Sequence, residues 1–193
     1  MNHAGHVAGG IVAGSLVCFL AYSTGDVKIG FEVLNEISDS PFSPTENTKT
    51  LFGLFATALF MALFPDLDIQ SITQRWFYRA VFVLLGIMHF TGRHDLFVVI
   101  SFCAVLPVLH QHRGWTHWKI TPWVIAIFLA TVQEYFHAQQ RNYGSFEWVK
   151  VLGLLEQYWL FVIACVTGHY VHLILDARSM RWLKFISNDS NHH

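Results

Sequence analysis

The sequence has little charge of either sign. Only 13% of its 193 residues are Asp, Glu, Lys or Arg, against about 25% in an ordinary soluble domain. The formal net charge is −1, and no cluster of Lys and Arg appears along the chain. Bulk attraction to a phosphate backbone is therefore excluded as the basis of function, and no nucleic-acid partner is expected.

Cysteine is also scarce. The chain has three, Cys18, Cys103 and Cys165, and each lies inside an apolar run, with no CxxC pair. We interpret them as small buried hydrophobic side chains. The residues before the first apolar run contain no Lys or Arg, whereas a secretory signal peptide begins with positive charge, so this run is expected to be a retained helix.

What the chain has in abundance is apolar sequence. Six apolar stretches stand out, at residues 5–23, 50–65, 76–91, 95–110, 120–137 and 149–176. They predict an all-α, multi-pass helical membrane bundle of about six apolar helices, although most are shorter than the ~20 residues that cross a bilayer. A hydrophobic bundle that dips into one leaflet is the alternative. We expect one domain over residues 1–186, with a polar loop insert at 24–49 and a disordered tail at 187–193.

If the six stretches alternate in direction, one side of the membrane receives the N-terminus, the 66–75 turn, the 111–119 loop and the C-terminal tail. That side carries seven Lys and Arg residues against five on the other. The bias places it in the cytoplasm. Four motifs rich in His and Asp also lie on this side. Residues from separate motifs can form one site only if they lie on the same side of the membrane.

The last of these motifs contains His169, His172 and Asp176 at spacing i, i+3, i+7. On a helix these residues share a face, and imidazole and carboxylate are ligands for zinc and other divalent ions. Ionisable groups against apolar runs are costly and are presumed functional. The alternative is a capped helix end with partly exposed polar residues.

Two further motifs supply more ligands of the same kind. Asp66 and Asp68 follow Pro65, and their i, i+2 spacing in an extended turn would direct both carboxylates around one pocket. A helix stop or an N-cap is the alternative there. His6, after Gly5, opens the first apolar run and gains weight because it shares a side with the other motifs.

The most unusual stretch is His112-Arg113-Gly114-Trp115-Thr116-His117. Gly114 allows a tight loop, and Arg113 offers a fork of donors for phosphate or carboxylate oxygens. Thr116 is predicted to cap the helix that follows. The alternative is an interfacial loop with snorkelling basic groups.

These four motifs in this order resemble the YdjM-type family of bacterial inner-membrane, metal-dependent hydrolases. The matching positions are Gly5-His6, Pro65-Asp66-Leu67-Asp68, His112 to His117, and Gly168, His172 and Asp176. The resemblance implies a location in the bacterial inner membrane. The sequence differs from the family pattern at Ile69, where the family often has His, and at Ala177-Arg178-Ser179. A family ligand is therefore expected to be missing, and His169 is a candidate substitute for it.

The motifs and the resemblance together predict a membrane-bound hydrolase with two metal ions, zinc in the first place and manganese as the alternative. A phosphoester of a membrane lipid or lipid-linked molecule is the expected substrate. Asp68, Arg113 and His117 are the expected catalytic residues. A transporter of metal ions or small solutes, or a membrane protein with a purely structural metal, are the alternatives. The expected metal ligands are His6, Asp66, Asp68, His112, His117, His169, His172 and Asp176.

Overall fold

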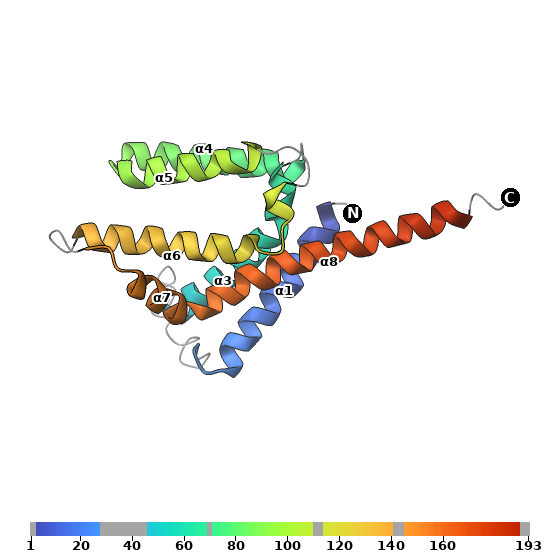
Figure 1. Cartoon of the computed structure of the whole chain (residues 1–193), viewed down its shortest axis with the longest axis horizontal. Coiled ribbons are helices and arrows are strands. Elements are labelled where there is room, and N and C mark those ends of the chain that lie inside the picture. The colour runs from blue at the N-terminus through green and yellow to red at the C-terminus, as the bar shows by residue number, and fades with distance from the viewer. Residues whose placement is uncertain (1–2, 28–45, 69–70, 110–113, 141–144, 190–193) are drawn as a thin grey trace, which may run out of the picture.

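The computed structural model describes residues 3–27, 46–68, 71–109, 114–140 and 145–189 (Figure 1). All of the regular structure in these ranges is helical, as the apolar runs predicted. The elements follow one another as α1 (His3–Ser23), α3 (Glu46–Leu63), η1 (Phe64–Asp68), α4 (Ile72–Phe90), α5 (His94–Val105), η2 (Leu106–Leu109), η3 (Trp115–His117), α6 (Thr121–Gln140), α7 (Trp148–Gln157) and α8 (Trp159–Asp189).

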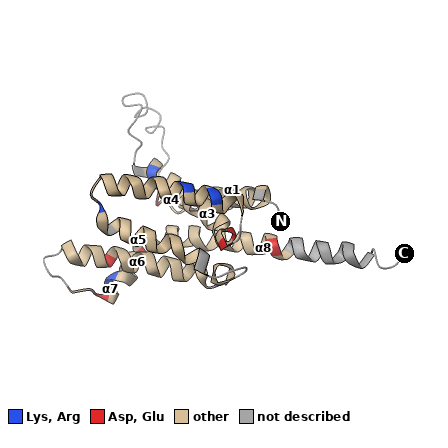
Figure 2. Cartoon of the chain, turned by 90° about the horizontal axis from the view of Figure 1, so that it is seen from above, with Lys and Arg blue, Asp and Glu red and all other residues tan. Residues whose placement is uncertain are grey.

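Three helices, α1, α3 and α8, pack together as the core of the molecule. Their contact is formed by small and aliphatic side chains, including Ala13, Val17, Leu54, Ala58 and Ala164. Ala, Gly and other small residues let helix backbones approach closely in an apolar solvent. Three segments are long and apolar enough to cross a membrane: Ala4–Ser23 in α1, Asn47–Asp68 in α3 and η1, and Trp159–Ala177 in α8. These segments are compatible with a membrane protein, and Figure 2 shows how few charged residues the described helices carry.

The prediction of six apolar spans is not confirmed. Among the described residues, the helices α4, α5 and α6 do not have the length or hydropathy of a span. Helix α5 ends at Val105, before Pro107, and has 12 residues, so it measures about 18 Å at 1.5 Å per residue. That is short of the ~30 Å hydrocarbon layer. Helix α6 carries Glu134 and His137 in its second half.

The apolar run predicted at 149–176 is two helices. α7 ends at Gln157 with Tyr158 as its C-cap, and α8 begins at Trp159. α8 then continues to Asp189, so residues 187–189 are helical where the sequence suggested a disordered tail. Residues 190–193, and residues 28–45 of the predicted polar insert, lie outside the described ranges.

The turn after α3 is a 3₁₀ helix, where the sequence analysis expected an extended turn. Pro65 lacks a backbone N–H and cannot continue the hydrogen-bonding pattern of α3. The turn buries Phe64, Pro65 and Leu67. Ser71 fixes its end, because the Ser71 hydroxyl donates to the carbonyl oxygen of Asp66 at 2.9 Å and accepts from the N–H of Gln74 at 3.0 Å.

Candidate metal centre

Six of the predicted ligands meet at one end of the three-helix core. We call His6, Asp66, Asp68, His117, His172 and Asp176 the site cluster. His6 is near the start of the span Ala4–Ser23, and the other two spans end at Asp68 itself and at Ala177, one residue after Asp176. Because α1 runs opposite to α3 and α8, its beginning lies beside their ends. The chain thus brings together polar groups up to 170 residues apart in sequence, from His6 to Asp176.

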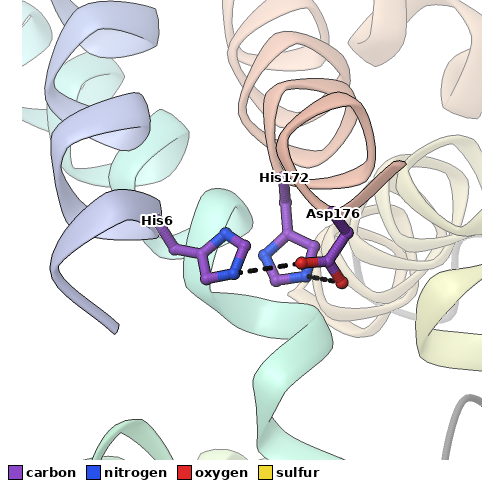
Figure 3. A group of neighbouring side chains, drawn as sticks. All are labelled: His6, His172 and Asp176. Carbon is purple, nitrogen blue, oxygen red and sulfur yellow. Dashed lines mark ion pairs between the residues drawn. The ribbon is translucent and has the colours of Figure 1, made fainter. Parts of the chain in front are cut away.

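Asp176 lies at the centre of this cluster. Its Oδ1 is 3.3 Å from Nε2 of His6, and its Oδ2 is 3.6 Å from Nε2 of His172 and 4.0 Å from Nε2 of His117. Figure 3 shows its carboxylate at the edges of the His6 and His172 rings, which stack at 4.0 Å between centroids. One carboxylate therefore faces imidazoles from α1, η3 and α8.

The environment of His172 fixes which of its ring nitrogens is protonated. The ring is fully buried, and its Nδ1 lies 2.8 Å from the carbonyl oxygen of Ala62. A carbonyl oxygen can only accept, so Nδ1 carries the hydrogen and Nε2 keeps its lone pair. That lone pair has no hydrogen-bond partner, although Asp66 Oδ1 is 3.9 Å away and Asp176 Oδ2 is 3.6 Å away.

These separations fit a shared cation. Hydrogen bonds of this kind are about 2.7–3.2 Å long, so 3.6 and 3.9 Å are too long for direct bonds. In a tetrahedral zinc site with ligands at about 2.0–2.2 Å, neighbouring ligand atoms are about 3.4 Å apart. His6, His172 and Asp176 offer ligand atoms that all lie within 4.8 Å of one another. The donor set therefore suits a divalent ion.

The 3₁₀ turn separates the two neighbouring carboxylates. A 3₁₀ helix has about three residues per turn, so residues i and i+2 point in different directions. Asp66 faces His172, whereas Asp68 is 3.6 Å from Nδ1 of His117 and accepts a hydrogen bond from Thr116 at 2.9 Å. Asp66 and Asp68 thus face two neighbouring parts of the cluster. In an extended turn both carboxylates would have faced the same pocket.

Thr116 links Asp68 to His117. Its hydroxyl donates to Oδ2 of Asp68 and lies 3.3 Å from Nδ1 of His117. The hydroxyl has one hydrogen, so it must accept from Nδ1–H of His117, and this leaves Nε2 of His117 with its lone pair toward Asp176. The predicted helix-capping role of Thr116 is wrong, because the α-helix that follows begins only at Thr121 and the Thr116 hydroxyl bonds Asp68 instead.

The structure places His169 beside the η3 loop. Its Nε2 lies 3.0 Å from the carbonyl oxygen of Trp118, and the neighbouring Tyr170 hydroxyl donates to the carbonyl oxygen of Lys119 at 3.1 Å. The hydroxyl of Thr121 donates to the carbonyl oxygen of Trp115. Helix α8 therefore holds the loop that carries His117. Nδ1 of His169 is buried without a hydrogen-bond partner, and its role as a metal ligand stays a prediction.

The cluster concentrates negative charge in an apolar setting. It contains three carboxylates, and the side chain of Asp68 is fully buried with its Oδ1 lacking a hydrogen-bond partner. Buried carboxylates of this kind need cations or protons to compensate them. Two divalent ions would more than neutralise the three acids and leave the site attractive to an anion.

The sequence-predicted residues His112 and Arg113 lie outside the described part of the chain. Two contributors were not foreseen as parts of the site: the carbonyl of Ala62 and the hydroxyl of Thr116. No residue type marks a backbone carbonyl in advance. The role of Thr116 could have been predicted, because Thr116 is next to His117 and the second ring nitrogen of a metal-binding imidazole is commonly hydrogen-bonded.

No family model matches this sequence, and no curated protein or solved structure matches it either. The resemblance to YdjM-type hydrolases stays a prediction that depends on the motifs. Functional inference therefore starts from the geometry of the site cluster.

Replacing Thr116 by Val is expected to weaken metal binding while the molecule keeps its shape. Val fills the same space but cannot bond Asp68 or fix the tautomer of His117, and loss of such supporting bonds typically costs about 10- to 100-fold in metal affinity. Competition with a chromophoric chelator measures the affinity. Thr116→Ser should restore it, and Thr131→Val, which removes a hydroxyl bonded only to the Ile127 carbonyl, should leave it unchanged. Unaltered affinity in Thr116→Val would contradict the proposed link.

Proposed function

We propose that this chain is a membrane-bound, metal-dependent hydrolase that cleaves a phosphoester of a lipid or lipid-linked molecule. The observation that carries the proposal is the set of 3.3 to 4.0 Å separations between imidazole nitrogens and carboxylate oxygens of four distant segments. The motif resemblance to YdjM-type inner-membrane hydrolases supports it. Zinc is the proposed ion, with two bound and manganese as the alternative.

The position of the cluster favours an enzyme over a carrier. Transporters bind their ions near the bilayer midplane, where helices are broken. Here the cluster residues on the candidate spans lie within five residues of a span end, and His117 lies outside the spans. A group at the membrane edge can receive a polar head while apolar chains stay in the hydrocarbon.

Partial exposure of the cluster favours catalysis over a purely structural metal. A structural site saturates its ion with protein ligands, whereas a catalytic site keeps a position open. The side chains of Asp66, His117 and Asp176 are 15%, 16% and 23% exposed. Solvent or substrate can therefore reach three of the donor groups.

Distinct roles follow from the distinct surroundings of the residues. His6, Asp66, His172 and Asp176 would hold metal, and His117 would join them through Nε2. Bound divalent ions would supply Lewis acidity and lower the pKa of water to about 7. Asp68 Oδ1, buried and without a hydrogen-bond partner, would accept the proton of the attacking water. Arg113, which lies outside the described residues, is proposed to bind the anionic part of the substrate.

Removal of metal is expected to abolish hydrolysis, and its return to restore it. The protein, purified in detergent, is treated with a chelator, dialysed, and assayed on bis(p-nitrophenyl) phosphate and on phospholipid in mixed micelles. We expect about two equivalents of zinc per chain at saturation, as in two-metal hydrolases, and recovery of turnover with zinc or manganese. Protein that holds no metal under any loading would overturn the proposal. Metal without turnover on either substrate would favour a structural ion.

A further inference from the structure

An apolar groove lies between α3 and α4, and two of its lining residues, Val7 and Leu67, adjoin members of the site cluster in sequence. We call it the α3–α4 groove. It has a volume of about 580 Å³, within the ~300–1,000 Å³ typical of small-molecule sites. In Figure 1 the two helices both extend leftward from the η1 turn. Its lining residues are Val7, Leu59, Phe60, Leu63, Leu67, Thr73, Trp76, Phe77, Ala80, Val81 and Leu84.

One face of α4 forms a wall of the groove. Its contributions recur at helical spacing from Thr73 to Leu84, a length of about 17 Å at 1.5 Å per residue. Trp76 is 65% exposed and Phe60, on the α3 wall, is 43% exposed. These two aromatic side chains therefore offer open surface to an apolar chain that enters the groove.

The groove and the site cluster share backbone. Val7 follows His6 in α1, and Leu67 stands between Asp66 and Asp68 in η1. The lining contains no charged side chain, whereas the adjoining cluster contains three carboxylates and the imidazoles that face them. An uncharged groove next to a proposed cation site complements an amphiphile with an apolar chain and an anionic head.

From this continuity we infer that the α3–α4 groove binds an acyl chain of the substrate and so selects lipid phosphoesters over water-soluble ones. The inference rests on the proposed function, because it places the lipid's phosphate at the site cluster. Leu59 and Leu63 belong to the last turns of the candidate span in α3. An acyl chain in the groove would therefore lie in the hydrocarbon layer while its head group is outside it.

Two substitutions on α4 distinguish the effect of filling the groove from the effect of adding an aromatic ring elsewhere on the helix. Ala80 is an exposed residue on the groove wall, so Ala80→Phe would fill the groove without disturbing a buried contact. Val83, 59% exposed and outside the lining, gives the matched control Val83→Phe. Each buried CH₂ changes affinity by about fourfold. Blocking two or three methylenes should therefore lower kcat/KM for a long-chain phospholipid at least about tenfold.

The expected pattern is selective. Ala80→Phe loses turnover of the long-chain phospholipid and keeps that of bis(p-nitrophenyl) phosphate, while Val83→Phe keeps both. Equal turnover of the phospholipid by wild type and Ala80→Phe would overturn the inference, and so would a parallel loss on both substrates. If the wild type is a dimer in detergent and Ala80→Phe is a monomer, a second copy of the chain occupies the groove and the lipid assignment fails.

A binding measurement keeps the inference testable if hydrolysis itself is not found. A lysophospholipid brominated along its chain quenches nearby Trp, and Trp76 lines the groove. The contribution of Trp76 is the part of the quenching that is lost in Trp76→Phe. This part should saturate with added lipid in the wild type and in Val83→Phe, and should be absent in Ala80→Phe. Saturable quenching without turnover would leave the groove assignment standing and overturn only the hydrolase. Absence of saturable quenching in the wild type would overturn the groove assignment.

Discussion

His172→Asn is expected to abolish metal binding and leave the helices intact. The amide nitrogen of Asn can occupy the place of Nδ1 and donate to the Ala62 carbonyl, as the imidazole does at 2.8 Å. What disappears is Nε2, the buried lone pair 3.6 Å from Asp176 and 3.9 Å from Asp66. Loss of a supporting residue already costs about 10- to 100-fold in metal affinity, and loss of a ligand should exceed about 100-fold.

Metal content after gel filtration measures this effect, with circular dichroism to follow helicity. His172→Ala and Asp66→Ala should lose metal as well. His89→Ala is the matched control, because His89 is an exposed residue at the end of α4 whose ring packs near Phe90 and His94. Should His172→Asn retain the full metal complement, the site cluster would not be a metal centre.

Gly168→Ala is expected to disrupt the core itself. A Cβ at this position would overlap the carbonyl oxygen of Ala58 and lie 2.9 Å from its carbonyl carbon. Both are backbone atoms of α3, so no rotamer change relieves the clash and the two helices must separate. Overpacking typically costs about 1–3 kcal/mol and occasionally more. Because the obstacle is backbone, we expect a loss of about 3 kcal/mol or more in the free energy of unfolding.

The separation of α3 from α8 should also weaken metal binding, since these helices carry Asp66 and His172. Thermal unfolding in detergent, with and without zinc, measures both effects. Gly153→Ala on α7 is the control, because a Cβ there meets no atom within 4 Å. That change should be neutral or stabilise by up to about 1 kcal/mol, the difference in helix propensity between Ala and Gly. Wild-type stability and metal affinity in Gly168→Ala would contradict the packing of α3 against α8.

The sequence by itself determined the helical class and two of the core helices. Apolar runs at 5–23 and 50–65 correspond closely to α1 and α3, because a long uninterrupted apolar stretch is hard to satisfy in any other way. The sequence also indicated which ionisable residues lie against apolar runs, where their burial costs free energy, and so which residues are candidates for a shared site. His6, Asp66, Asp68, His117, His172 and Asp176 could be selected from residue type and position alone.

Tertiary structure decided how the predicted residues are used. Whether a run of residues such as 149–176 stays one helix depends on neighbours, and the chain breaks it at Tyr158. His169 has the same side chain as His172 and lies three residues away, yet its Nε2 meets the Trp118 carbonyl. Contacts across 50 to 110 residues direct each ring nitrogen. Local spacing defines a helix face, but only packing between helices fixes which atom has a partner.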